Sequence, residues 1–233
     1  MKNQTRNGNA IRRMVVIAMF TAMAYVVMLL IHIKVAFLTL DVKDAVITLC
    51  GLYFGPVAAL FISVAVPLLE LSVSTTGYYG LIMNILGSVA FSVTASLIYK
   101  YKKTLIGAIV ALFSGAFLMI AVMLLANLFI TPFYMGVTAE AVRDMIPTLL
   151  LPFNALKAAL NVGVVLLLYK SMSRALRRAG FLSSRPTGAA AQPARGARTV
   201  TVIMLLVSVL LIAASTVLIF TVFDGSFSFG ISK

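Results

Sequence analysis

The 233-residue sequence is poor in charged, metal-binding and redox-active side chains. Only 11% of the residues are charged, with 6 acidic against 19 basic, and there is one cysteine, Cys50, one histidine, His32, and no tryptophan. A single cysteine excludes an internal disulfide, and one cysteine with one histidine leaves too few of the usual ligands for a zinc site. GxSxG, HExxH and P-loop motifs are also missing. We therefore predict no catalytic residues and no metal, and an enzyme is the weaker functional class.

The abundance of apolar residues indicates a membrane protein. Hydrophobic residues make up 62% of the chain and the mean hydropathy is +1.09, more than a soluble core of this size can bury. In a soluble protein the net charge of +13 would suggest nucleic acid as a partner. Here the basic residues form short clusters between apolar spans, which reports membrane topology instead. We expect a lipid bilayer around the chain and no nucleic acid.

Residues 44–71 decide how many times the chain crosses the membrane. These 28 residues contain Gly55-Pro56. At 1.5 Å per residue they reach ~42 Å, more than one crossing needs and less than two full crossings require. The helix that follows, at 80–99, ends in Lys100, Lys102 and Lys103, which the positive-inside rule places on the side of the basic N-terminus. The chain must then cross the membrane an even number of times between the N-terminus and Lys100. This requires two short passes within 44–71, with a turn at Gly55-Pro56.

With two passes the charges separate cleanly. Fourteen of the 19 basic residues fall inside, in 2–13, 100–103, 170–178 and 185–198, and all six acidic residues fall outside or at the outer boundary. A single pass would move the lysines after residue 99 to the other side. We therefore predict a multi-pass protein of the cell membrane with a cytoplasmic N-terminus.

The predicted organisation is an all-α, integral membrane fold with a six-helix core and one additional C-terminal transmembrane helix. The segments are a basic tail at 1–12, the core at 13–179, a Gly/Ala/Ser/Pro/Arg linker at 180–198 that we expect to be disordered, the extra helix at 199–222 and a tail at 223–233. Residues 34–44 are expected to form a loop that is apolar and acidic at once, able to cover a site.

The most informative stretch is 151–161, which reads LPFNALKAALN. Asn154, Lys157 and Asn161 are spaced i, i+3 and i+7, so they share one face of a helix. A lysine inside a bilayer helix costs at least ~2.5 kcal/mol unless it meets water, protein or ligand. We interpret this face as the floor of a polar binding site. The alternative is that Lys157 extends its amine to the nearer membrane surface.

Other polar and aromatic side chains approach the same outer half of the membrane. Asn84 and Asn127 join Asn154 there, and their carboxamides match the donor and acceptor edge of a heterocyclic amide, while Lys157 donates to a carbonyl, carboxylate or phosphate oxygen. The asparagines could equally link helices to one another. An aromatic wall is available, with packing or a membrane-interface belt as the alternative for each ring: Phe37, Tyr78, Tyr79, Phe133, Tyr134 and Phe153.

Four motifs carry a resemblance to a known family. They are the AxxxA pattern of Ala18 and Ala22, LDVKDAVITLCGLYFGP at 40–56, TTGYYGLIMN at 75–84 and LPFNALK at 151–157. In this order, over residues 13–178, the chain resembles the substrate-binding S components of energy-coupling factor (ECF) vitamin transporters, and within them the riboflavin-specific branch.

The resemblance implies a membrane subunit that captures riboflavin at the outer face and releases it inward with a transmembrane coupling subunit and two ATP-binding subunits. It implies no cofactor besides the transported riboflavin. Ala18 and Ala22 would dock on the coupling subunit. By the same resemblance, Asn154, Lys157 and Asn127 would hydrogen-bond the flavin, with the backbone of Leu38, Thr39 and Leu40 nearby. Asn84 and Phe153, from the polar and aromatic residues described above, complete the expected substrate-binding residues.

Two alternatives remain at the level of the sequence. The first is an S component for another vitamin or a small carboxylate-bearing precursor, since a lysine with amides suits those ligands too. The second is a membrane scaffold without a ligand. Because no intramembrane chain of acidic residues and no ATPase motif is visible, a transporter of this kind would take its driving force from a partner.

Overall fold

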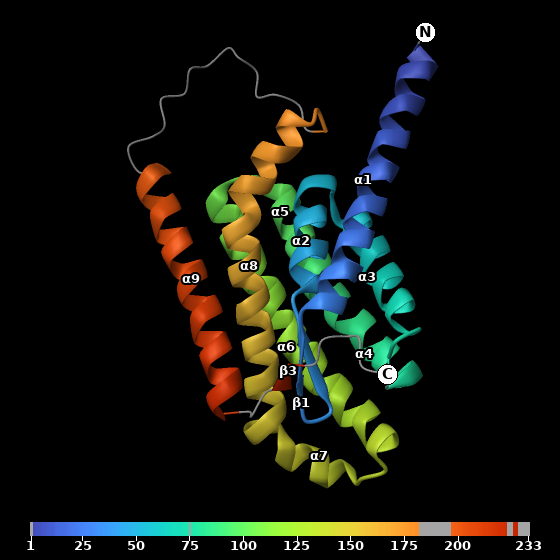
Figure 1. The fold of residues 1–233 in the computed structure, drawn as a ribbon, viewed down its shortest axis with the longest axis vertical. Helices are drawn as coiled ribbons and strands as arrows, with labels where there is room; N and C mark the ends of the chain where they lie inside the picture. The colour runs from blue at the N-terminus through green and yellow to red at the C-terminus, as the bar shows by residue number, and fades with distance from the viewer. Residues whose placement is uncertain (1, 75, 182–196, 223–225, 228–233) are drawn as a thin grey trace.

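A computed structural model describes residues 2–74, 76–181, 197–222 and 226–227. In this part of the chain, five helical segments are long and apolar enough to cross a membrane, at 10–30, 77–101, 105–135, 139–178 and 201–221. The helices stand side by side as a bundle (Figure 1). The predicted helical membrane architecture is therefore present.

Helix α1, Lys2–Leu30, lies on the outside of the bundle. It begins well before residue 13, where the first helix was predicted to start, so α1 includes most of the segment predicted as a basic tail at 1–12. A stripe of Val16, Phe20, Ala24 and Met28 is buried against the core, and this spacing of four residues keeps the stripe on one face. The opposite face is exposed.

A β-hairpin replaces the loop predicted at 34–44. Strands β1, His32–Val35, and β2, Leu38–Asp41, pair antiparallel, and β3, Ser226–Phe227, pairs with the other edge of β1. Ile33 and Val35 are buried while Lys34 between them is exposed, which is the period of two expected for a strand. That alternation was the sequence signal for the hairpin, and the prediction of a loop did not take it into account.

The chain turns back at Gly55, as predicted. Helix α2, Lys43–Phe54, and helix α3, Pro56–Glu70, pack against each other, and Gly55 between them has a φ of 95°, which suits glycine. Pro56 occupies the first turn of α3, where a missing N–H is harmless. With 12 and 15 residues both helices are short, and α2 is buried along almost its whole length. Its neighbours shield it.

Two of the long helical segments, 77–101 and 139–178, each contain a π-helical turn. Helix α4, Gly77–Ser88, runs through Val89–Val93 into α5, Thr94–Tyr101, and α7, Ala139–Met145, runs through Ile146–Leu150 into α8, Leu151–Arg178. Helix α6, Leu105–Met135, lies between them in sequence. A Cβ on Gly115 of α6 would lie 2.6 Å from the Phe91 carbonyl oxygen, so glycine permits the close approach of α6 to the first π turn.

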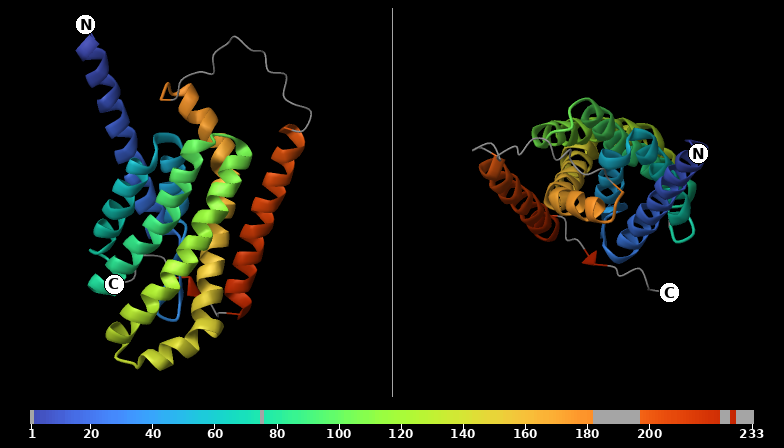
Figure 2. Two further views of the ribbon diagram at one scale, coloured as in Figure 1. Left: turned by 180° about the vertical axis from the view of Figure 1, so that it is seen from behind. Right: turned by 90° about the horizontal axis from the view of Figure 1, so that it is seen from above.

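Helix α9, Ala197–Val222, corresponds to the predicted extra helix at 199–222 and packs on α8, away from α1 (Figure 2). A Cβ on Gly163 of α8 would lie 2.9 Å from Ile212 Cγ1 and 3.1 Å from the Ser208 carbonyl oxygen. Glycine at this position therefore sets how closely α9 can approach. Most of the predicted linker at 180–198 and of the tail at 223–233 lies outside the described residues.

The two ends of the bundle differ. The start of α1, the end of α5 and the end of α8 lie at one end, and the hairpin turn and α7 lie at the other (Figure 1). The basic clusters at 100–103 and 170–178 therefore share an end with the N-terminus, as the charge pattern predicted.

Candidate functional site

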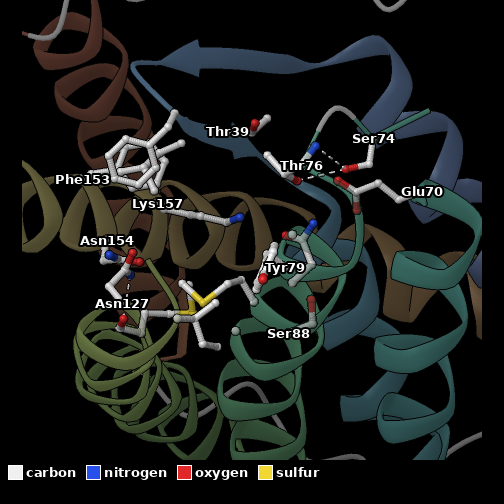
Figure 3. Close-up of a pocket in the computed structure, with 18 of the residues that line it drawn as sticks. Thr39, Glu70, Ser74, Thr76, Tyr79, Ser88, Asn127, Phe153, Asn154 and Lys157 are labelled. Carbon is white, nitrogen blue, oxygen red and sulfur yellow. Dashed lines mark hydrogen bonds between the residues drawn. The ribbon is translucent and has the colours of Figure 1, made fainter. Parts of the chain in front are cut away.

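A cavity of about 270 Å³ lies in the half of the bundle that contains the hairpin. It is bordered by the hairpin, the loop after α3, and helices α4, α6 and α8 (Figure 3). Lys157 reaches from α8 into the middle of this space, and Glu70, Ser74 and Thr76 lie on the opposite side. We refer to it as the hairpin cavity.

The structure brings most of the predicted substrate-binding residues to this cavity. Its lining includes Leu38, Thr39, Asn84, Asn127, Phe153, Asn154 and Lys157. Leu40 is the exception, because its side chain is 1% exposed and packs with Ile33 and Phe153 in an apolar cluster. Hydrophobic burial determines the position of the Leu40 side chain, and the expectation that the backbone of residues 38–40 lies near the ligand stays a prediction.

The aromatic wall is smaller than predicted. Phe37, Tyr79, Tyr134 and Phe153 line the cavity. The rings of Tyr79 and Tyr134 approach each other with centroids 6.0 Å apart, a distance at which aromatic pairs attract. The other two predicted members, Tyr78 and Phe133, are exposed on the outside of the bundle.

The lysine that drew attention in the sequence has a counter-ion. Lys157 Nζ lies 3.0 Å from Asp41 Oδ2, with the aspartate buried and the lysine side chain 12% exposed. The sequence predicted a polar binding site around this amine but not the aspartate that pairs with it. The cavity and the ion pair together make a charged amine tolerable at this depth.

Asp41 is the centre of a larger ion-pair cluster. Its Oδ1 accepts a hydrogen bond from the backbone N–H of Lys43 at 3.2 Å, its Oδ2 lies 3.5 Å from Lys43 Nζ, and that amine in turn donates to Glu70 Oε2 at 2.5 Å. Burial raises the pKa of the Asp41 carboxyl, but the charges of Lys157 and Lys43 and their hydrogen bonds outweigh it and lower that pKa to about 2. Asp41 therefore stays ionised and holds Lys157 in one orientation.

Asn161, the third member of the polar face, has a structural role. Its Oδ1 accepts from the Ala45 N–H at 2.8 Å, and its Nδ2 donates to the carbonyl oxygens of Asp41 at 3.1 Å and Lys157 at 2.9 Å. These bonds join α8 to the end of β2 and the start of α2. Asn161 does not line the cavity. Its role is to hold the backbone of Asp41 in place through these hydrogen bonds.

Two of the three carboxamides that line the cavity, those of Asn154 and Asn127, are each oriented by their own helix. Asn154 Nδ2 donates to the Leu150 carbonyl at 2.8 Å, within the π-helical turn, and Asn127 Nδ2 donates to the Met123 carbonyl at 2.7 Å. Thr131 donates to Asn127 Oδ1 at 2.9 Å. A carboxamide has two N–H donors and two lone pairs on its oxygen, so each side chain keeps hydrogen-bonding capacity for a ligand.

The far side of the cavity offers hydroxyl and carboxylate groups. Ser88 donates to Asp44 Oδ1 at 2.5 Å, and the Ser74 and Thr76 hydroxyls lie 3.0 Å apart beside Glu70. Phe153, two amides and a lysine on one side, with hydroxyls and the Tyr79 ring on the other, suit a ligand that has a flat heterocycle and a hydroxylated portion.

Comparison with known proteins identifies the family. Residues 12–169 match the model of the ECF transporter, substrate-specific component. The chain belongs to this family. It is a substrate-specific component of a membrane transporter and not an enzyme, which confirms the resemblance in its motifs.

Two relatives agree with this assignment. The chain is 29% identical over 176 residues to the riboflavin transporter RibU of Staphylococcus aureus (strain TCH60), a match that covers 72% of this chain and 93% of that protein. The solved structure described as the S component of a bacterial ECF transporter superposes with a TM-score of 0.62 at 29% identity, covering 72% of this chain and 98% of that one. The family match ends at residue 169, before α9.

The small-residue pair of this S component lies away from the hairpin cavity. Ala18 and Ala22 are both exposed on α1, on the face that carries Val15, Met19 and Val26. They do not pack within the described part of the chain, so packing inside the bundle does not account for the AxxxA pattern. Helix α9 stands on the opposite side of the bundle and leaves this face uncovered (Figure 2).

Proposed function

We propose that this S component binds riboflavin in the hairpin cavity. The observation that carries the proposal is the convergence of Lys157, Asn127 and Asn154 with aromatic side chains in one cavity. The 29% identity to a protein named as a riboflavin transporter supports the same ligand.

The chemistry of each group fits a part of this ligand. The imide edge of the flavin ring presents carbonyl acceptors and an N–H donor, which Asn127, Asn154 and the Lys157 amine complement. Phe153 and Tyr79 offer apolar faces for the ring. Ser74 and Thr76, with Thr39, offer hydroxyls that match the ribityl chain. Asn84 lines the same space and provides a further amide.

Asp41 contributes without lining the cavity. It holds the Lys157 amine in one orientation, so the lysine enters the complex already oriented and loses little conformational freedom on binding. Asp41 is therefore a positioning residue for the proposed ligand contact.

We further propose that the protein works as the membrane subunit of an ATP-driven uptake complex. Its N-terminus lies in the cytoplasm, since the basic ends of α5 and α8 share that end of the bundle, and the hairpin cavity then faces outward. The exposed Ala18 and Ala22 permit a close helix contact with the transmembrane coupling subunit, to which two ATP-binding subunits supply energy. The binding unit is the core at 13–179, and α9 is appended to it.

The experiment is to identify the small molecule that remains bound to the purified protein. The protein is denatured, and the released ligand is measured by mass spectrometry against a mock purification. Riboflavin at close to one per chain supports the proposal, and a different vitamin or a small carboxylate would overturn the ligand. A thermal-shift panel of vitamins on protein stripped of ligand gives the same distinction, because only a true ligand stabilises the folded state.

A further inference from the structure

A second cavity, of about 280 Å³, lies at the end of the bundle opposite the hairpin. It is lined by Arg13 of α1, by the turn between α2 and α3, and by Lys100 and Lys103 at the end of α5 and just beyond it. Gly51 and Ser96, both buried, form part of its inner surface. We refer to it as the inner-rim pocket.

Within the described part of the chain, the positive charge of the inner-rim pocket has no counter-ion. Arg13 Nη2 donates to the Phe54 carbonyl at 2.5 Å, which anchors the guanidinium and leaves its other N–H groups available. Its lining contains no acidic residue, and the ion pairs found among the described residues all belong to the Asp41 cluster in the other half of the bundle. Helix α3 begins at this pocket and helix α2 ends there, so their dipoles oppose each other and the positive potential comes from the three cationic side chains. The three clustered cations repel one another, and a bound anion would relieve this repulsion.

The surroundings of the pocket are apolar. Val57 and Phe61 on α3 are 74% and 61% exposed, and Leu60 beside them and Met14 and Val15 on α1 are also exposed. In a membrane protein such side chains face hydrocarbon. The pocket thus lies where a cationic surface meets a lipid-facing one.

We propose that the inner-rim pocket binds the phosphate headgroup of an anionic membrane lipid, with the acyl chains along the exposed faces of α1 and α3. Arginine binds phosphate oxygens in a bidentate manner and lysine supplies point charges, so Arg13, Lys100 and Lys103 form a suitable donor set. Basic pockets between transmembrane helices on the cytoplasmic side have this preference in general. A free anion would gain nothing from the apolar surroundings, which is why the structure favours a lipid.

The test uses the full-length protein in bilayers that contain equal amounts of dioleoylphosphatidylglycerol and dioleoylphosphatidylcholine. Native mass spectrometry then counts the lipids that remain bound. The double variant Lys100→Gln/Lys103→Gln removes two of the charges, and Lys102→Gln is the matched control, because Lys102 lies between them, is exposed and does not line the pocket. We expect retention of one phosphatidylglycerol to weaken about tenfold in the double variant and to remain at the wild-type level in the control.

Each other outcome contradicts the proposal. Equal retention in wild type and double variant overturns the site, and equal loss in Lys102→Gln shows an unspecific charge effect. If inorganic phosphate raises the melting temperature as much as phosphatidylglycerol does, the pocket binds a free anion and the lipid assignment is wrong. If the double variant keeps its lipid but no longer assembles with the coupling subunit, the pocket is a protein contact. Equal melting temperatures of the lipid-free proteins in detergent exclude misfolding as the cause.

Discussion

The Lys157 amine and the Asp41 carboxylate lie 3.0 Å apart, although 116 residues separate them in the chain. This contact joins the hairpin to α8 at the edge of the cavity. It makes the position of the lysine depend on a residue that does not reach the ligand space itself.

Replacing Asp41 should therefore affect both stability and binding. Asp41→Asn leaves the buried Lys43 with less negative charge and frees Lys157, and loss of one member of a buried ion-pair cluster costs about 3 kcal/mol of unfolding free energy. We expect a lower melting temperature and weaker riboflavin binding. Asp144→Asn, at an exposed acid on α7, is the control and should change neither. If Asp41→Asn behaves like the control, the cluster has no such role.

A double-mutant cycle measures the interaction energy of Asp41 and Lys157 apart from their other contacts. In Asp41→Asn/Lys157→Met the lysine charge is gone, so the loss of stability should be smaller than the sum of the two single losses by about 1 kcal/mol or more. Thermal unfolding of the four proteins in one detergent measures this coupling. Strict additivity would show that the two side chains do not interact.

Replacing Asn154 and replacing Asn161, which share one helix face, should affect different properties of the protein. Asn161→Leu leaves the Ala45 N–H and the Asp41 carbonyl without this partner in a buried place, so we expect mainly a lower melting temperature. Asn154→Leu removes a group that lines the cavity, so we expect mainly weaker binding, about tenfold at the loss of one hydrogen bond. Titration and thermal unfolding of both variants test this, and the reverse assignment would contradict the division of the polar face.

Acid should weaken the fold through Asp41. The pKa of its carboxyl is lowered in the folded state, from an ordinary value near 3.8 to about 2. Its contribution of about 2 kcal/mol is therefore complete above pH 4 and is lost as the pH falls from about 4 to 2. The melting temperature of the wild type should fall more steeply over this range than that of Asp41→Asn. Parallel curves would contradict the shift.

The contact between α8 and α9 can be tested at Gly163. A β-branched side chain at this position meets Ile212 and the Ser208 carbonyl, so Gly163→Val should push α9 away and lower the melting temperature. In a chain truncated after residue 180, which lacks α9, the same substitution should cost little. Thermal unfolding of both backgrounds provides the measurement, and an equal loss in both would place the strain within the core.

The sequence predicted the bundle well because apolar length and charge clusters report membrane crossings directly. The turn at Gly55-Pro56 followed from the parity of the lysines after residue 99, and the helix period placed Asn154 and Lys157 together. The Asp41 contact could not be read in this way, since it joins segments far apart in sequence. The sequence signal for this contact was an acidic residue, Asp41, followed closely by Lys43 and Asp44 in an otherwise apolar region.

The division between Asn154 and Asn161 was beyond the helical period as well. Residues at i and i+7 point the same way, but their positions along the helix axis differ. Asn161 is hydrogen-bonded to Asp41 at the end of the hairpin, whereas Asn154 lines the cavity. The position of Leu40 has a similar cause. Its neighbours Leu38 and Thr39 border the cavity while its own side chain completes an apolar cluster, and only the packing of the hairpin on α8 determines which is which.

The most direct test of the account is a titration of ligand-free protein with riboflavin, followed by the quenching of flavin fluorescence. We predict saturation at one riboflavin per chain for the wild type, an affinity at least about 30-fold weaker for Lys157→Met, and no change for Lys102→Met at the opposite end of the bundle. Absence of saturable quenching in the wild type, or equal affinity in wild type and Lys157→Met, would contradict the proposal that Lys157 holds the transported ligand.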